Sequence, residues 1–425
     1  MRKSGWGFFV LFLLVGLAGF LITHAQVYYR LGLLSAFLLA VSYVWSSVSL
    51  TGVELTVRNR SYKAHVGEVF DQVIQVTNRS FLPLLFLEVT DLSGLYGGAG
   101  SRLITWVGPM QTRTFTTHHR LGRRGFFHVG RKLVRSGDPL RFFFREKEFS
   151  FPLDLLVYPA IYPISAYYPD PAILKDGRQA RKRSLEPTVQ FAEIRPYVAG
   201  DDLKKIHWLS SRKLNKLMVR EFEQYSNEES WCFLDAEINQ YWRNENKKPE
   251  SDPWIFTKKE QVVITEDTFE YCASIAASIC HLMVRRNMPV GLLATTREPL
   301  RLSPEVGLRQ ESKLMELLAL SEPNGRLSLE GLIQNAINGI RPGSTIFLLT
   351  TRSAANLHSA ILRLMAHKCR PVLIQVTAPG LDRSDEATSA GRLLDFPVCV
   401  VPLGADIQIT MEKFFDKRRT PNHAF

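Results

Sequence analysis

Two long apolar stretches near the start of the chain limit its fold more than any other feature. Residues 4–29 contain no Asp, Glu, Lys or Arg, and after Arg30 the stretch Leu31–Leu50 is uncharged again. Each stretch is about as long as the 17–25 residues that a helix needs to cross a bilayer. Since only the short interval His24–Arg30 separates them, residues 1–50 are predicted to form two transmembrane helices in a hairpin. Aromatic side chains suited to the membrane interface lie near the segment ends: Tyr28, Tyr29, Tyr43 and Trp45.

Basic residues around this hairpin predict its orientation. Arg2 and Lys3 precede the first segment, and the turn contains only Arg30. Further basic residues follow the second segment: Arg58, Arg60 and Lys63. The positive-inside rule therefore predicts a multi-pass protein of the cell (inner) membrane with both its N- and C-termini in the cytoplasm. If the first segment is instead a cleaved signal peptide, the second still anchors the body on the cytoplasmic side.

The rest of the chain has the composition of globular protein. The whole sequence of 425 residues is 45% hydrophobic and 22% charged, which excludes disordered and collagen-like classes and predicts two or three domains. Its net charge of +12 suits a polyanionic partner, either an anionic membrane surface or nucleic acid. The five cysteines are widely spaced, lie in apolar runs and form no C-x-x-C pair. They are predicted to be buried thiols rather than a disulfide framework or a zinc site.

Two patterns divide the part beyond the hairpin. Residues 51–159 show period-two alternation interrupted by turn signals, as in Val53–Val57 and Val69–Val76, and this is typical of an all-β sandwich. A Pro-rich and basic linker is expected over residues 160–187. Residues 188–425 then alternate apolar strands with amphipathic helices, which predicts a doubly wound parallel α/β sheet. The expected strands are 231–234, 290–294, 345–349, 372–376 and 398–401, and the expected helices are 268–286, 311–320, 329–340 and 357–367.

The densest motif lies at the start of this last region. Residues 195–208 read R-P-Y-V-A-G-D-D-L-K-K-I-H-W, and a charged segment, Val219–Glu223, follows. Gly200 suits a turn, an aspartate after it can cap a short helix through Ile206, and Leu217–Phe222 alternates like a strand. From the residues alone, a mutual ion-pair lattice is favoured over an active site. The candidate residues are Arg195, Tyr197, Gly200, Asp201, Asp202, His207, Trp208, Arg212, Arg220 and Glu221.

This motif resembles a bacterial family, the domain of unknown function numbered fifty-eight. The resemblance is most specific over Phe191–Asp235 and extends more loosely upstream, to Arg124-Gly125-Phe126 and Gly137-Asp138-Pro139-Leu140. It implies a von Willebrand factor A-like fold for the C-terminal domain. It also implies association with a MoxR-type AAA+ ATPase and often with a transglutaminase-like membrane protein, and it implies no established reaction.

Von Willebrand A domains commonly bind Mg²⁺ through D-x-S-x-S after their first strand, because hydroxyl and carboxylate oxygens suit this hard cation. Here the aspartate is present as Asp235, but Glu237 and Asn239 replace the serines. After a later strand, Arg352 stands where another acidic ligand is expected, so a cation would occupy the place of the metal charge. The sequence therefore predicts a degenerate site at Asp235, Glu237 and Asn239 and no resident cofactor, with Mg²⁺ as the alternative.

The favoured function is a membrane-anchored, cytoplasm-facing adaptor that docks a partner such as the ATPase, in complex assembly or cell-envelope processes. A hydrolase or transferase that uses Asp201, Asp202 and His207 as acid–base groups is one alternative. It is less favoured because the sequence contains no G-x-S-x-G, Walker A or H-E-x-x-H pattern. A nucleic-acid-binding membrane protein is the second alternative. The basic and aromatic stretch Arg113–Lys147 and the cluster Lys175–Arg183 fit an anionic membrane surface better.

Overall fold

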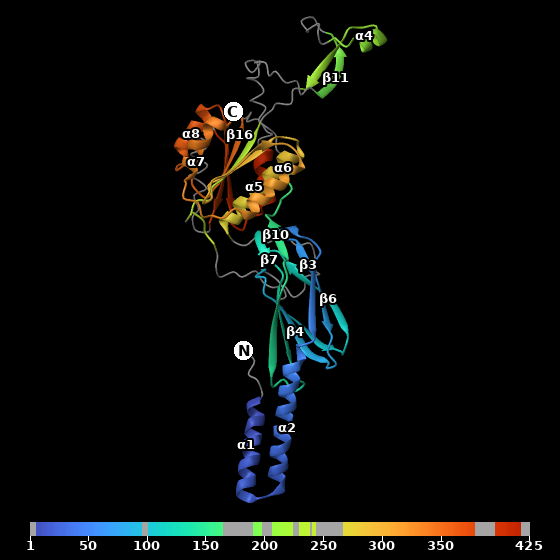
Figure 1. Cartoon of the computed structure of the whole chain (residues 1–425). Helices are drawn as coiled ribbons and strands as arrows, with labels where there is room; N and C mark the ends of the chain where they lie inside the picture. Colours follow the sequence, from blue (N-terminus) through green and yellow to red (C-terminus); the bar gives the residue numbers. More distant parts are fainter. Residues whose placement is uncertain are drawn as a thin grey trace.

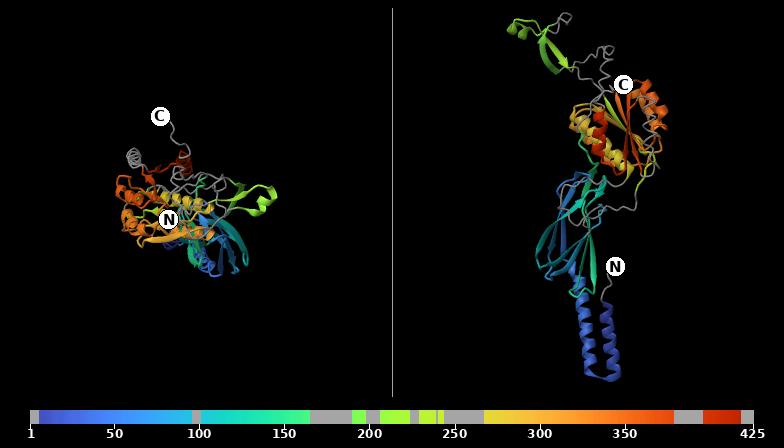
Figure 2. Two further views of the ribbon diagram at one scale, coloured as in Figure 1. Left: turned by 90° about the horizontal axis from the view of Figure 1, so that it is seen from above. Right: turned by 180° about the vertical axis from the view of Figure 1, so that it is seen from behind.

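The computed structural model describes residues 6–95, 101–164, 190–197, 206–223, 229–238, 240–243, 267–378 and 396–417. Figure 1 shows a helical hairpin, a β region and an α/β domain arranged one after another along an elongated molecule. The views in Figure 2 show the same order from behind and the narrow profile from above.

The hairpin consists of α1 (Trp6–Thr23) and α2 (Gln26–Ser49). The turn is shorter than predicted, because only His24 and Ala25 separate the helices and Arg30 lies within α2. A Cβ on Gly16 would lie 2.8 Å from the backbone nitrogen of Gly32, so small residues let the helix backbones meet. By length and composition alone, Gln26–Ser49 is the one helix in the described part of the chain that could cross a membrane. The apolar part of α1, Val10–Ile22, is shorter than Gln26–Ser49.

The β region follows α2 after only three residues. Its strands are β1 (Val53–Asn59), β2 (Lys63–His65), β3 (Val69–Asn78), β4 (Leu84–Asp91), β5 (Ser101–Val107), β6 (Thr112–Arg120), β7 (Gly125–His128), β8 (Arg131–Gly137), β9 (Phe144–Ser150) and β10 (Asp154–Tyr158). The sheets have the orders β1-β3-β6, β5-β4-β8-β9 and β2-β10-β7. Along β1 every second residue is buried, as period-two alternation requires. Residues from the first two sheets share one apolar core, with Ile74 and Val76 from one and Leu87 and Val134 from the other.

A charged group is enclosed within this β region. The ammonium of Lys132 lies 2.6 Å from Asp91 Oδ2 and donates to Gln72 Oε1, also at 2.6 Å. His119 Nε2 lies 3.3 Å from the same carboxylate. Because Lys132 and His119 are buried, desolvation lowers the pKa of each side chain.

The α/β domain contains a six-stranded sheet in the order β15-β14-β13-β16-β17-β18. The strands are β13 (Ser230–Leu234), β14 (Val290–Ala294), β15 (Leu300–Glu305), β16 (Thr345–Thr350), β17 (Arg370–Thr377) and β18 (Val398–Pro402). All neighbours pair in parallel except β14 and β15. This order, which runs outward on both sides from the first strand, confirms the doubly wound α/β prediction.

Helices cover both faces of this sheet (Figure 1). Helices α5 (Thr268–Arg285), α6 (Leu308–Leu320) and α10 (Ile407–Lys417) contribute to one apolar cluster, and α7 (Leu329–Ala336) and α8 (His358–Ala366) contribute to the other. Alternate residues of each central strand enter the two clusters, as with Cys232 and Phe233. All five cysteines are buried thiols, which confirms the prediction made for them. The sequence had not predicted β15 or α10.

The β region and the α/β domain share the first of these clusters, in which Phe70 and Leu155 lie together with Leu314 and Leu318 of α6. Arg124 joins the two parts at this junction. Its guanidinium lies 2.6 Å from Glu270 in the first turn of α5 and donates to the carbonyls of Leu318 and Ser321 at the end of α6. The same side chain therefore neutralises a buried carboxylate and satisfies carbonyls that a helix end leaves unpaired.

The motif forms a separate small unit. Strand β11 (Gln190–Pro196) pairs antiparallel with β12 (Met218–Glu223), and the short helix α4 (Trp208–Leu214) lies between them in sequence. This two-stranded sheet is not part of the six-stranded sheet. The predicted helix does not extend through Ile206, since Ile206 forms an antiparallel bridge with Val219 and α4 begins at Trp208. The rest of the predicted helix, from Asp201 or Asp202, lies outside the described residues. Pairing with β12 buries Ile206, which a free helical turn would leave exposed.

Candidate functional site

A cluster of polar side chains lies at the carboxyl edge of the six-stranded sheet, where open α/β sheets place their ligands. Its centre is Asp235, which directly follows β13 and is fully buried. Asp235 Oδ2 accepts a hydrogen bond of 2.7 Å from the hydroxyl of Thr350 at the end of β16. Its Oδ1 accepts from the backbone N–H of Glu237 at 3.2 Å and from Thr295, just after β14, at 3.4 Å. Three adjacent strand ends therefore hold this carboxylate in place.

Arg352 supplies the positive charge of the cluster. Its Nε lies 3.5 Å from Asp235 Oδ2, and its terminal nitrogens pair with Glu237 and with Glu330 in the first turn of α7, the latter at 3.3 Å. The Arg352 side chain is only 15% exposed. One guanidinium thus faces three carboxylates. This geometry agrees with the sequence interpretation that Arg352 brings a cation to the place of the expected metal.

The donor set at Asp235 does not fit Mg²⁺. That ion requires about six oxygen ligands at roughly 2.0–2.1 Å, usually including water. The oxygens of Asp235 already accept hydrogen bonds from hydroxyl and backbone donors. Arg352, paired with Glu237, adds a positive charge that would repel a metal cation. Within the ranges that the structure describes, no group of three or more His, Cys, Asp or Glu residues is arranged to hold a metal. Asn239, the remaining predicted ligand, lies outside those ranges.

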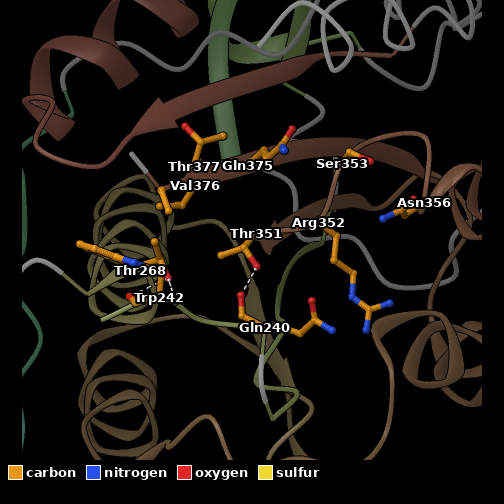
Figure 3. A pocket seen from close by; sticks show the side chains of 11 residues that line it. Gln240, Trp242, Thr268, Thr351, Arg352, Ser353, Asn356, Gln375, Val376 and Thr377 are labelled. Atoms are coloured by element: carbon orange, nitrogen blue, oxygen red, sulfur yellow. Dashed lines mark hydrogen bonds between the residues drawn. The ribbon is translucent and has the colours of Figure 1, made fainter. Parts of the chain in front are cut away.

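A cavity of about 200 Å³ opens beside this cluster (Figure 3). Its labelled side chains include Gln240, Thr351, Arg352, Gln375 and Thr377, and a hydrogen bond joins Thr351 to the backbone carbonyl of Gln240 at 2.9 Å. Gln375 Oε1 is buried without a hydrogen-bond partner among the described residues. None of the described lining residues is His, Cys, Asp or Glu. The described lining can bind hydrogen-bonding groups and includes no general base or thiol nucleophile.

Two groups beneath the cluster, the buried Cys272 and the half-buried Tyr241, are held in their neutral forms. The hydroxyl of Tyr241 donates to the backbone carbonyl of Asp235. Burial is the main cause that raises the pKa of both Tyr241 and Cys272 well above the ordinary values of a phenol and a thiol. Because the anionic form is the nucleophile for a cysteine, Cys272 is inert at neutral pH.

The structure only partly brings the motif residues together. Arg195, Arg220 and Glu221 lie on the paired strands β11 and β12, with Arg195 opposite Val219, and Tyr197 follows β11. The predicted residues Gly200, Asp201 and Asp202 lie outside the described ranges. The motif strands and Asp235 belong to different sheets.

His207 has a structural role at the start of α4. Its Nδ1 accepts from the backbone N–H of Ser210 at 3.3 Å and lies 2.7 Å from the Ser210 hydroxyl. Ser211 closes the same unit, because its hydroxyl donates to the carbonyl of His207 and accepts from the N–H of Met218. These contacts cap the helix and attach it to β12, and they occupy the ring nitrogen that faces the serine.

Large apolar side chains are exposed on and just after α4. Trp208 is 68% exposed and Leu209 is 78% exposed, and Leu214 and Leu217 are also exposed. Arg212 is exposed on the same short helix, and Lys213 and Lys216 are exposed beside it. We call Trp208, Leu209, Arg212, Leu214 and Leu217 the α4 surface. Sequence reasoning selected Trp208 and Arg212 but missed the leucines. Their signal was weak, because leucine in a short amphipathic stretch normally indicates core.

The six-stranded sheet and its polar edge define a doubly wound α/β domain, with the motif unit preceding it in the chain. Residues 193–345 match the family model described as "Protein of unknown function DUF58", which confirms the family resemblance over this segment. The "Uncharacterized protein YeaD" of Bacillus subtilis (strain 168) is 24% identical over 246 residues. This alignment covers 55% of the present chain and 54% of that protein, so the chain spans about half the length of this relative.

Solved structures similar to this chain include two von Willebrand A domains. The SpRpn10 VWA domain is 12% identical and covers 45% of this chain and 94% of its own, with a TM-score of 0.28. The von Willebrand factor type A protein from Catenulispora acidiphila is 10% identical and covers 47% of this chain and 43% of its own, also with a TM-score of 0.28. The α/β class itself follows from the strand order described above.

Proposed function

We propose that this protein is a membrane-tethered adaptor whose C-terminal half docks a protein partner through the α4 surface. The observation that supports this most directly is the exposure of Trp208 and Leu209, at 68% and 78%, next to Arg212 within the family-matched segment. Tryptophan and arginine are enriched among residues that dominate binding energy at protein interfaces. Grouped, exposed apolar side chains of this size indicate an interaction site.

The partner that we propose is a MoxR-type AAA+ ATPase, as the family resemblance implies, with a transglutaminase-like membrane protein as a second component. The basic side chains Arg212, Lys213 and Lys216 fit an acidic rim on that ATPase, which would steer encounter between the two proteins. The hairpin α1–α2 serves as the anchor in this proposal, and both chain termini lie in the cytoplasm, where an ATPase has access to ATP.

The chemistry at the sheet edge gives little support to the hydrolase or transferase alternative. Asp235 is buried and saturated with hydrogen bonds, the adjacent cavity lacks a base among its described residues, and His207 caps a helix. Asp201 and Asp202 lie outside the described ranges, so their acid–base role stays a prediction.

The nucleic-acid alternative is weakened by pairing among the basic residues of the β region. Arg131 lies 2.8 Å from Glu148, and Arg135 lies 3.6 Å from Glu146 on the neighbouring strand. Alternating charges of this kind do not form the continuous basic path that tracks a phosphate backbone.

The test is co-purification of the ATPase with the full chain from native membranes. The double variant Trp208→Ala, Leu209→Ala should reduce the captured ATPase more than tenfold, because truncating a hot spot costs about 2 kcal/mol and about 1.4 kcal/mol is a factor of ten. Leu308→Ala is the matched control, since Leu308 is 76% exposed on α6, away from the α4 surface in sequence. Equal capture by folded wild type and the double variant would refute docking through this surface. Asp201→Ala with Asp202→Ala tests whether the predicted turn supports it.

A further inference from the structure

We propose that three loops at the α2 end of the β region enter the headgroup layer of the membrane and bind anionic lipid. These membrane-facing loops are residues 79–83, 108–111 and 138–143, which link β3 to β4, β5 to β6, and β8 to β9. The inference rests on the proposed membrane anchoring by α2 and adds a second, lipid-binding surface to it. Its consequence is that the β region stands in one fixed orientation on the bilayer rather than swinging from its helix.

Strand register places all three loops at one end of the β region. Val53 at the start of β1 pairs with Asn78 at the end of β3. Leu84 at the start of β4 pairs with Val107, and Leu85 pairs with Gly137 at the end of β8. Since α2 ends at Ser49, only a short connection before Val53, this is the end at which the apolar helix enters. Figure 1 shows this end of the β region beside the end of α2.

The loop 138–143 extends alongside the helix itself. The rings of Phe143 and Tyr43 pack edge to face with centroids 5.7 Å apart, and Arg145 donates to the hydroxyl of Ser47 at 3.3 Å. Tyr43 lies six residues before Ser49, which is about 9 Å along the helix axis at 1.5 Å per residue. The loop therefore reaches past the end of α2 toward its middle. If α2 spans the bilayer, Tyr43 and Phe143 lie at the depth where aromatic side chains favour the interface.

Buried hydrogen bonds fix the shape of this loop. Asp138 is fully buried, and its carboxylate accepts from the backbone N–H groups of Leu140 at 3.0 Å and Phe143 at 2.7 Å. The turn between them presents Leu140, which is 45% exposed, at its tip. A rigid loop loses little conformational entropy when its tip contacts lipid.

The exposed side chains of the three loops have the composition of a membrane-contacting surface. Phe81 is 88% exposed and Met110 is 68% exposed, and together with Leu140 each loop contributes one large apolar residue. Basic side chains lie in or next to the loops at Arg79, Arg113, Arg141, Arg145 and Lys147. Two acidic residues lie near them: Glu54 pairs with Arg79 at 2.8 Å, and Glu146 pairs with Arg135 at 3.6 Å, so a basic excess remains. Apolar residues that enter the acyl boundary, combined with basic residues near anionic headgroups, are the two contributions that hold proteins on membrane surfaces.

Site-directed spin labelling of the full chain in nanodiscs with equal parts of phosphatidylcholine and phosphatidylglycerol tests this proposal. All five native cysteines are buried, so single exposed cysteines can be labelled selectively. Labels at Phe81→Cys and Leu140→Cys should be relaxed more by oxygen than by a water-soluble nickel complex, as expected for lipid contact. The control Tyr62→Cys replaces a 65% exposed residue just before β2, at the opposite end of the β region, and should show aqueous behaviour.

A fourth label separates failure of this inference from failure of the anchor. Phe37 is 63% exposed on α2, and a label at Phe37→Cys should be shielded from the nickel complex if α2 spans the bilayer. An aqueous signal at Phe37 would refute the anchor. Shielding at Phe37 with aqueous signals at Phe81 and Leu140 would refute the loop proposal alone. Protection of Phe81 and Leu140 from both relaxing agents would indicate a covering protein and would also overturn it.

The charge contribution has its own comparison. In nanodiscs of phosphatidylcholine alone, the label at Phe81→Cys should shift toward aqueous behaviour, because the basic residues lose their anionic partners. The pair Arg79→Gln, Arg113→Gln should produce the same shift in the mixed lipid. If lipid charge and these substitutions leave the signal unchanged, anionic lipid recognition is refuted.

Discussion

Replacing Arg352 by methionine should destabilise the α/β domain strongly. Methionine keeps much of the length of the side chain and removes its charge. The variant leaves Asp235, which is fully buried, facing Glu237 and Glu330 without a cation. Breaking a buried ion pair from one side costs about 3–5 kcal/mol, since an uncompensated charge stays behind. Glu237 and Glu330 are 22% and 29% exposed and can turn toward water, so the lower end, about 3 kcal/mol, applies here.

This loss corresponds to a clear shift in the melting temperature. For a domain of this size, 1 kcal/mol lowers the melting temperature by roughly 2–4 °C, so Arg352→Met should lower that of the α/β domain by about 6–12 °C. Thermal unfolding of the full chain in nanodiscs, with hydrogen exchange of β13 and β16 as the local readout, measures it. Arg309→Met on the exposed surface of α6 is the matched control and should change the melting temperature little. If Arg352→Met and Arg309→Met have the same melting temperature, Arg352 does not stabilise the sheet edge.

Adding Mg²⁺ tests whether the guanidinium of Arg352 takes the place of a metal ion beside Asp235. Millimolar Mg²⁺ should not shift the melting temperature of the wild type, because Arg352 already neutralises Asp235 and Glu237. In Arg352→Met the same oxygens lose their cation, so Mg²⁺ should raise the melting temperature by binding the folded state. Stabilisation of the wild type by Mg²⁺ would refute the argument that its donor set does not fit the ion.

Three further perturbations test other parts of the molecule. Arg124→Met removes the nearer cation of the buried Glu270 and leaves only Arg123, whose Nε lies 3.9 Å away. It should cost about 3 kcal/mol, the lower end for a broken buried pair, with faster hydrogen exchange at both α5 and α6; unchanged exchange would show that the junction does not depend on Arg124. Burial lowers the pKa of His119 below its ordinary 6.5, so on acidification the unfolded chain binds this proton first. The free energy of unfolding of the β region should therefore fall as pH decreases through about 6.5, and His119→Gln should flatten that slope in urea titrations from pH 7.5 to 5.5. Gly325→Ala should lower the melting temperature, because its Cβ would lie 1.4 Å from the carbonyl oxygen of Thr295; an unshifted transition would show that this loop adjusts freely.

The sequence predicts the central sheet well because parallel strands covered on both faces are continuous apolar runs. Strands β13, β14, β16 and β17 are buried along nearly their whole length. Strand β15 was missed because it is an edge strand in which half-buried residues such as Leu300 and Leu302 alternate with exposed ones. Its alternating pattern is too short to distinguish a strand from a loop. It also pairs antiparallel with β14, and the alternation of strands and helices in the sequence predicts only parallel pairs.

The polar edge was predictable where its residues follow strands. Asp235 and Arg352 lie just beyond the ends of β13 and β16, which pair in the sheet, and the family resemblance implied that these two loops meet at one site. Glu330 was not predicted, because it comes from the first turn of α7 and its contact depends on how that helix packs. The predicted end of the motif helix at Ile206 was wrong for a related reason. Ile206 follows a capping pattern in sequence, yet pairing with Val219 wins because it buries an apolar side chain.

The connections between parts of the molecule bear on how an adaptor of this kind would work. Leu50, directly after α2, belongs to the core of the β region, so the helix and the first strand are joined without a flexible linker. At the opposite end, Arg124 and a shared apolar core join the β region to α5 and α6. If the membrane-facing loops also hold the β region on the bilayer, the α/β domain stands at a fixed height above the membrane. A partner would then meet that domain at a defined distance, and loosening Arg124 should weaken partner capture even though it lies outside the α4 surface.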